Sequence, residues 1–118
     1  MKKVLIIEDE KPLREVYSLI LEKEGFEVNT AANGAIGIKK LHSFNPDLIV
    51  LDILMPVMDG ITFLKSVDLK NNYPHIKTIV VSNLSDPLED IDKYSVVHCF
   101  LKVDLSPVDL AIAAKKYT

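Results

Sequence analysis

The sequence predicts one doubly wound α/β domain, in which a five-stranded parallel sheet carries about five helices on its two faces. Apolar runs alternate with helical patterns five times along the 118 residues, which is typical of a βα-repeating sheet protein. The run Leu48-Ile49-Val50-Leu51 lacks polar alternation, as expected for a strand buried on both faces. The length suits one hydrophobic core, so we expect a single domain over residues 1–118.

The expected strands are separated by segments with recognisable helix boundaries. Strands are expected at about residues 3–7, 26–30, 48–51, 78–81 and 96–101. Helix starts are marked by a proline or a capping side chain, at Pro12, Asn33, Asp86 and Ser106. Gly25 fits the position just past the first helix. Another helix is expected from the spacing of Ile61, Leu64 and Val67, and we expect it to be broken by Asn71-Asn72 and Pro74.

Charge and cysteine content exclude several classes of protein. The 14 basic and 17 acidic residues give a net charge of −3, whereas a nucleic-acid-binding domain is normally basic. The single cysteine allows no internal disulfide and fits a reducing compartment. No apolar run approaches the ~18 residues of a membrane span. We expect a cytoplasmic domain that does not itself bind nucleic acid or membrane.

Polar side chains gather where four of the expected strands end. They are Glu8 and Asp9 after the first strand, Asp52 after the third, Ser82 after the fourth and Lys102 after the fifth. Each alone is more often a turn, cap or surface residue, but ligands of open parallel sheets bind at the carboxyl ends of the strands. Clustered carboxylates favour Mg²⁺. Mg²⁺, the Lys102 ammonium and the Ser82 hydroxyl would together bind a phosphoryl group, and Asp52 could attack its phosphorus atom.

Several segments resemble the receiver domain of two-component response regulators, across nearly the whole chain. The matching segments are Val4 to Glu10, Asp52 to Gly60, Val80-Val81-Ser82, and Leu101-Lys102 followed by Asp104 to Pro107. The loop that contains Met55-Pro56 and Asp59-Gly60 is the most specific of them. The resemblance implies a flavodoxin-like sheet with the strand order 2-1-3-4-5.

The resemblance also implies roles for the clustered residues. Asp52 would be the phosphoacceptor, phosphorylated by a sensor histidine kinase or a histidine phosphotransfer protein. Asp9, Asp52 and the backbone carbonyl of Leu54 would bind Mg²⁺ directly, and Glu8 would hold a metal-bound water. Such a domain promotes only its own phosphorylation and dephosphorylation, so we do not expect an enzyme that acts on other substrates.

An output mechanism is implied as well. Lys102 would pair with the phosphoryl group and Ser82 would move to bond it, which shifts the surface of the fourth helix, fifth strand and fifth helix. The family usually has Tyr or Phe three residues before the lysine, where this chain has Cys99. Either Cys99 occupies this switch position, which we favour, or a bulge re-aims Phe100. Val103 replaces the proline common after the lysine, so we expect either a trans bond or a strained cis bond there.

Three rival functions are weighed against this one. A degenerate receiver would serve only as a docking module; the intact Asp52, Asp9 and Lys102 argue against it, while the departures in the fifth strand keep it open. A small aspartate-nucleophile phosphatase would need a second acid two residues after the nucleophile, where this chain has Leu54. An FMN carrier would need a Ser/Thr/Gly-rich phosphate loop after the first strand, which is absent here. The downstream effector, whether an attached domain or a separate protein, is left unassigned.

Overall fold

Five parallel strands form one sheet in the computed structural model, which describes residues 1–83 and 91–118. The strands are β1 (Lys3–Ile7), β2 (Glu27–Ala31), β3 (Leu48–Asp52), β4 (Lys77–Ser82) and β5 (Val96–Leu101). Their order across the sheet is β2-β1-β3-β4-β5, and all neighbouring strands pair in parallel. The predicted fold class and strand order are confirmed.

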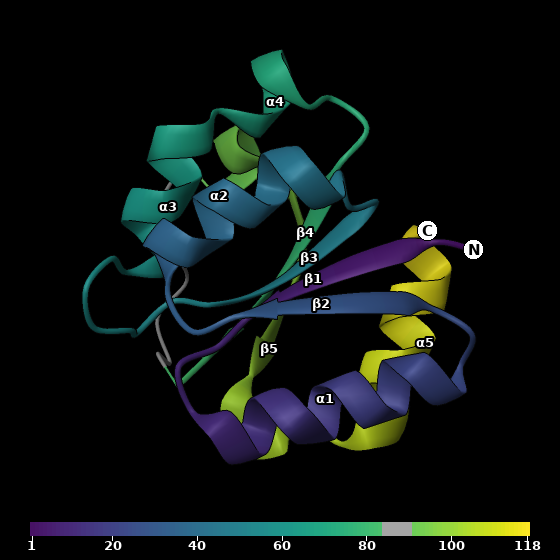
Figure 1. Cartoon of the computed structure of the whole chain (residues 1–118). Helices are drawn as coiled ribbons and strands as arrows, with labels where there is room; N and C mark the ends of the chain where they lie inside the picture. The colour runs from purple at the N-terminus through teal and green to yellow at the C-terminus, as the bar shows by residue number, and fades with distance from the viewer. Residues whose placement is uncertain (84–90) are drawn as a thin grey trace.

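Helices cover both faces of this sheet. They are α1 (Lys11–Lys23), α2 (Gly34–Phe44), α3 (Gly60–Val67), the short α4 (Leu69–Asn72) and α5 (Pro107–Tyr117), with 3-10 turns η1 (Ile91–Tyr94) and η2 (Lys102–Asp104). Helices α1 and α5 lie against one face, and α2 and α3 lie against the other (Figure 1). Within the described ranges, no helix has the length and apolar character needed to span a membrane.

Two apolar layers, one on each face of the sheet, stabilise the fold. The layer under α2 and α3 contains Leu5, Ile7, Ile49, Leu51, Phe63 and Leu64. The layer under α1 and α5 contains Val4, Ile6, Val50, Ile79, Val81 and Leu110. Successive strand residues alternate between the two layers, as the pleat of a strand requires. Since each large apolar side chain contributes about 1.5–3 kcal/mol when it is buried, these layers hold the strand ends in place.

Most helix boundaries follow the local signals in the sequence. The Asn33 side chain accepts a hydrogen bond from the Ile36 amide at 2.9 Å, and Ser106 caps α5 through a reciprocal pair of bonds with Asp109. Gly25 follows α1 with a φ of +94°, a left-handed conformation that glycine adopts without strain. The start expected at Asp86 lies outside the described residues.

The helical segment after Asp52 is divided in two. α3 stops at Val67, and Asp68 adopts a left-handed φ of 46°. The amides of Asn71 and Asn72 then bond back to the Asp68 carbonyl, and the short helix α4 ends at Asn72, two residues before Pro74. Helical structure thus ends where the sequence predicted, but the left-handed turn at Asp68 divides it into α3 and α4, which the sequence did not predict.

Candidate functional site

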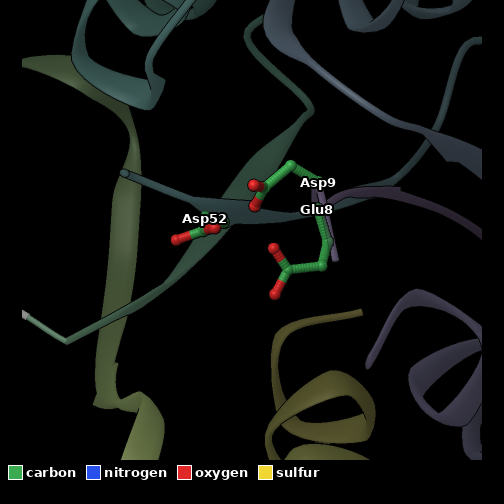
Figure 2. A group of neighbouring side chains, drawn as sticks. All are labelled: Glu8, Asp9 and Asp52. Carbon is green, nitrogen blue, oxygen red and sulfur yellow. The ribbon is translucent and has the colours of Figure 1, made fainter. Parts of the chain in front are cut away.

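The carboxyl ends of four strands meet at one edge of the sheet and bring the predicted residues together. Glu8 and Asp9 directly follow β1, and Asp52 is the last residue of β3. One carboxylate oxygen from each of these three residues lies within 4.8 Å of the others, and the three side chains face a common space (Figure 2). Within residues 1–83 and 91–118, this is the one cluster of three or more acidic, histidine or cysteine side chains that could share a metal ion.

Lys102 joins the acidic cluster from the end of β5. Its Nζ atom lies 2.6 Å from Glu8 Oε1 and 3.3 Å from Asp52 Oδ2. The exposed fractions of the three side chains are 10% for Lys102, 2% for Glu8 and 4% for Asp52. Burying an ion pair rarely adds net stability, because desolvation offsets the attraction between the charges. The buried group of Glu8, Asp52 and Lys102 at the carboxyl ends of the strands therefore indicates a functional site more than a stabilising interaction.

Burial and the neighbouring side chains shift the pKa values of Glu8 and Asp52. Burial, and then the neighbouring Asp52, raise the pKa of Glu8 to about 8, against the opposing effect of Lys102. Burial also raises the pKa of Asp52, while Glu8 and Lys102 act to lower it. For Lys102, burial acts to lower the pKa, but the two carboxylates outweigh it and the net shift is upward. The site therefore resists full ionisation, and an added cation would favour the charged carboxylates.

The loop after β3 holds Asp52 at the edge. The Leu54 amide donates to Asp52 Oδ1 at 3.3 Å, and the Gly60 amide donates to the Ile53 carbonyl at 2.9 Å. A Cβ atom on Gly60 would lie 2.6 Å from the Asp52 carbonyl oxygen. Asp59 caps α3 by accepting a bond from the Thr62 amide at 2.7 Å. Close packing of the helix start against the strand end thus positions the carboxylate.

Two residues of α1 approach the site, and neither was singled out for it from the sequence. Arg14 Nη1 donates to the backbone carbonyls of Glu8 at 2.8 Å and Asp9 at 3.3 Å. Tyr17 is 7% exposed, and its pKa is raised by burial and by the negative charge of Glu8. No sequence signal distinguishes Arg14 from a surface arginine, because its partners are main-chain atoms that every residue possesses.

Ser82 lies at the end of β4, and Cys99 and Phe100 lie in the neighbouring strand β5. Ser82 ends β4 and is buried, with 6% exposure. Cys99 is exposed. Its partner in β4 is Val80, which belongs to the layer under α2 and α3. Phe100 pairs with Val81 and packs into the layer under α1 and α5. The register shift in this strand pair lies upstream of both residues, so Cys99 and Phe100 face opposite sides of the sheet.

The chain after Lys102 turns at once. Lys102 and Val103 belong to η2, and Val103 is 77% exposed. No described peptide bond is cis, so the bond between these two residues is trans, the first of the two expected alternatives.

The chain matches the family model described as the response regulator receiver domain over residues 4–102. A protein-glutamate methylesterase/protein-glutamine glutaminase 1 of Anaeromyxobacter dehalogenans is 35% identical over 96 residues, which are 81% of this chain and 27% of that protein. A transcriptional regulatory protein, the CpxR homolog of Haemophilus influenzae, is 39% identical over 93 residues, which are 79% of this chain and 38% of that protein. The chain thus spans well under half the length of these relatives.

Solved structures agree with the family match. The chemotaxis protein CheY4 of Vibrio cholerae superposes with a TM-score of 0.87 at 27% identity, covering 100% of this chain and 99% of that one. The response regulator TrrA of Thermotoga maritima, solved in complex with Mg²⁺-BeF, gives a TM-score of 0.85 at 30% identity and covers 100% of both chains. The family match, the strand order and the acidic edge of the sheet lead to one conclusion: this chain belongs to the receiver domain family of two-component response regulators.

Proposed function

We propose that residues 1–118 form one receiver domain that acts as a phospho-accepting switch in a two-component phosphorelay, with Asp52 as the phosphoacceptor. The observation that carries this proposal is the buried contact between Lys102 and the carboxylates of Glu8 and Asp52, 2.6 Å and 3.3 Å from the ammonium. Asp52 offers a nucleophilic oxygen at the carboxyl end of β3. The Lys102 ammonium can pair with the negative charge of the phosphoryl group once Asp52 has accepted it.

The transfer is a displacement at phosphorus. A carboxylate oxygen of Asp52 attacks the phosphorus of a phosphohistidine on a sensor kinase or a histidine phosphotransfer protein. The new O–P bond forms as the N–P bond breaks, and the leaving imidazole takes up a proton. Lys102 then neutralises an oxygen of the transferred group. Attack by water on the acyl phosphate later releases inorganic phosphate and restores the Asp52 carboxylate, so the chemistry is confined to this domain.

The acidic cluster fits a divalent cation. Glu8 Oε2 is buried and has no hydrogen-bond partner within residues 1–83 and 91–118, and the three carboxylates supply only hard oxygen atoms, which Mg²⁺ prefers. Asp9, Asp52 and the backbone carbonyl of Leu54 would hold the ion, and Glu8 would orient a bound water. The metal would supply neutralisation of the phosphoryl oxygens during transfer.

Intact-mass measurement after incubation with acetyl phosphate and Mg²⁺ tests the phosphoacceptor. The wild type should gain one phosphoryl group, and the adduct should disappear in Asp52→Ala and when EDTA removes the metal. Asp59→Ala is a matched control, because it removes an exposed carboxylate of the same loop and should keep the adduct. An adduct that survives in Asp52→Ala, or a wild type that gains none, would overturn the proposal.

Ser82 and the edge strand β5 would transmit the phosphorylation signal to a partner. Phosphorylation would draw the Ser82 hydroxyl toward the new charge and repack the surface of β5, α5 and the fourth helix that the sequence predicts from Asp86, a start that lies outside the described residues. Cys99 stands three residues before Lys102, at the proposed switch position, with Phe100 as the alternative. The exposure of Cys99 also supports a rival, a receiver used only for docking.

Amide NMR with Mg²⁺ and beryllofluoride, the ligand pair bound in the structure of the Thermotoga relative, separates these two outputs. The switch requires shift changes that reach β5 and α5. Changes confined to residues within the acidic cluster and its loop would favour the docking module.

The partner expected upstream is a histidine kinase or phosphotransfer protein, and the downstream effector is an attached domain or a separate protein. Curated relatives include a methylesterase/glutaminase and a transcriptional regulator, which supports an effector that differs from one receiver to another. The net charge of −3 supports a domain that does not bind nucleic acid itself. We place it in the cytoplasm, where its proposed phosphodonor acts.

A further inference from the structure

The turn that carries Glu8 and Asp9 is tied down from two directions. On the sheet side, the Glu8 amide donates to the Ala31 carbonyl at the end of β2, at 3.0 Å. On the helix side, Arg14 Nη1 donates to the Glu8 carbonyl at 2.8 Å and to the Asp9 carbonyl at 3.3 Å. One guanidinium nitrogen thus spans both acidic residues through their main chain, and it does so from the second turn of α1.

This turn needs an anchor because local structure supplies little. Glu10, the N-cap residue of α1, makes no side-chain capping bond. The carboxylates that leave the turn approach Asp52 within 4.8 Å, where like charges repel each other. Without a tether, the turn would relax by swinging one carboxylate toward solvent.

Arg14 is suited to this task because it leaves the carboxylates free. Within residues 1–83 and 91–118, no ion pair joins Arg14 to an acidic side chain, and its side-chain bonds go to carbonyl oxygens. Lys102 already pairs with Glu8 and Asp52, and a second cation on these carboxylates would compete with a metal for the remaining oxygens. A planar guanidinium with fixed donors holds the main chain instead, and the Ser18 hydroxyl bonds to the Arg14 carbonyl at 2.8 Å.

We propose that Arg14 is a positioning residue for the Mg²⁺ site: by binding the carbonyls of Glu8 and Asp9, it holds their carboxylates toward Asp52 before the metal arrives. This inference rests on the proposed function, since it assigns a role within the same site. Partners that orient metal ligands commonly change metal affinity by about 10–100-fold when they are removed. When Mg²⁺ is bound, Asp9 as its ligand and Glu8 through a bound water would also be held in place, so the tether matters less at saturating metal. Loss of Arg14 should therefore weaken metal affinity and leave the rate at saturating metal nearly unchanged.

The test compares Arg14→Gln, Arg14→Lys and a control, Lys115→Gln. The control removes one positive charge as well, and it breaks the Lys115–Glu24 ion pair, which is remote from the acidic turn in sequence. Three measurements are made on each purified protein: the Mg²⁺ dissociation constant from amide NMR titration, the phosphorylation rate with acetyl phosphate across Mg²⁺ concentrations, and metal-free exchange of the Glu8 amide, which bonds to the Ala31 carbonyl. Urea denaturation checks that each variant is folded.

Arg14→Gln should raise the Mg²⁺ dissociation constant about tenfold, which corresponds to roughly 1.4 kcal/mol. Its rate at saturating Mg²⁺ should stay within about twofold of wild type, and the Glu8 amide, which bonds to the Ala31 carbonyl, should exchange faster without metal. Arg14→Lys should recover part of the affinity, because an ammonium restores the charge but not the fixed geometry. Lys115→Gln should match wild type in all three measurements.

An unchanged dissociation constant in Arg14→Gln overturns the inference, and so does full recovery in Arg14→Lys, which would mean that charge alone matters. A loss of rate at saturating Mg²⁺ overturns it too. If wild type binds Mg²⁺ but forms no adduct on Asp52, the proposed function fails while the affinities still decide the role of Arg14. A wild type that binds no Mg²⁺ overturns the inference, whereas the adduct on Asp52 is then judged separately by mass.

Discussion

Gly60 begins α3 directly beneath the acidic site, and we expect Gly60→Ala to destabilise the protein and disturb Asp52. A Cβ atom at this position would lie 2.6 Å from the Asp52 carbonyl oxygen and 2.8 Å from Ile53 Cα. Both are backbone atoms of β3 and the residue after it, and they cannot rotate away. The helix start must then move outward, and the hydrogen bond from the Gly60 amide to the Ile53 carbonyl at 2.9 Å must lengthen.

Two opposing effects set the magnitude. Forcing an extra carbon into a packed region typically costs about 1–3 kcal/mol. Alanine recovers up to about 1 kcal/mol in a helix, relative to glycine. The free energy of unfolding should therefore fall by about 1–2 kcal/mol. With a urea dependence of about 1–3 kcal/mol per molar for a small domain, the midpoint should fall by roughly 1 M.

Gly34→Ala is the matched control, because Gly34 also begins a helix behind a side-chain cap. Its nearest atoms all belong to the Met58 side chain, the closest at 2.9 Å, and a methionine side chain can move aside. Gly34→Ala should change the unfolding free energy by less than about 1 kcal/mol. Urea unfolding followed by circular dichroism, with phosphorylation by acetyl phosphate on the same samples, checks both variants. Equal midpoints for the two variants would refute the close-packing argument.

Three further perturbations have defined outcomes. Asp59→Ala should lose about 1 kcal/mol of stability at neutral pH. The bond from the Thr62 amide lowers the pKa of Asp59 below its ordinary value of 3.8. The stabilisation by the Asp59 carboxylate is therefore present at higher pH and disappears as pH falls through the folded-state pKa. A stability loss in Asp59→Ala that persists in urea unfolding at about pH 2 would contradict this reasoning. Lys102→Met should destabilise the metal-free protein by about 3 kcal/mol, since two buried carboxylates lose their cation, and added Mg²⁺ should restore part of the loss; a metal-independent effect would contradict the shared site. Val57 adopts a left-handed φ of 70°, so Val57→Gly should raise the free energy of unfolding by about 0.5–1 kcal/mol by relieving strain. Val108→Gly, in the helix α5, should lower the free energy of unfolding by about 1 kcal/mol in the same urea experiment.

The acidic cluster could be predicted because parallel topology converts a sequence pattern into proximity. Once strands 3–7 and 48–52 are recognised as parallel neighbours, Glu8, Asp9 and Asp52 must emerge at the same edge. The same logic brought Ser82 and Lys102 to that edge. Each of these residues follows an apolar run, which is a signal that a sequence carries locally.

Features that depend on distances between main-chain atoms were not predictable in this way. The break at Asp68 arises from a left-handed turn for which aspartate carries no strong signal. The role of Gly60 depends on how closely α3 approaches β3, and that of Arg14 on two carbonyls that carry no residue identity. The opposite facing of Cys99 and Phe100 follows from alternation, but their burial depends on which helices cover β5.

By itself, the sequence determined the fold class, the strand order through its family resemblance, and the set of polar residues at the strand ends, because apolar periodicity and chain direction are local properties. Only the tertiary structure decided that Lys102 bridges Glu8 and Asp52, that these acids are dry enough for the Glu8 pKa to rise to about 8, and that Arg14 anchors their turn. Those properties depend on packing between elements far apart in the chain. There, small differences in interatomic distance and the exclusion of water set the energies of charges and hydrogen bonds.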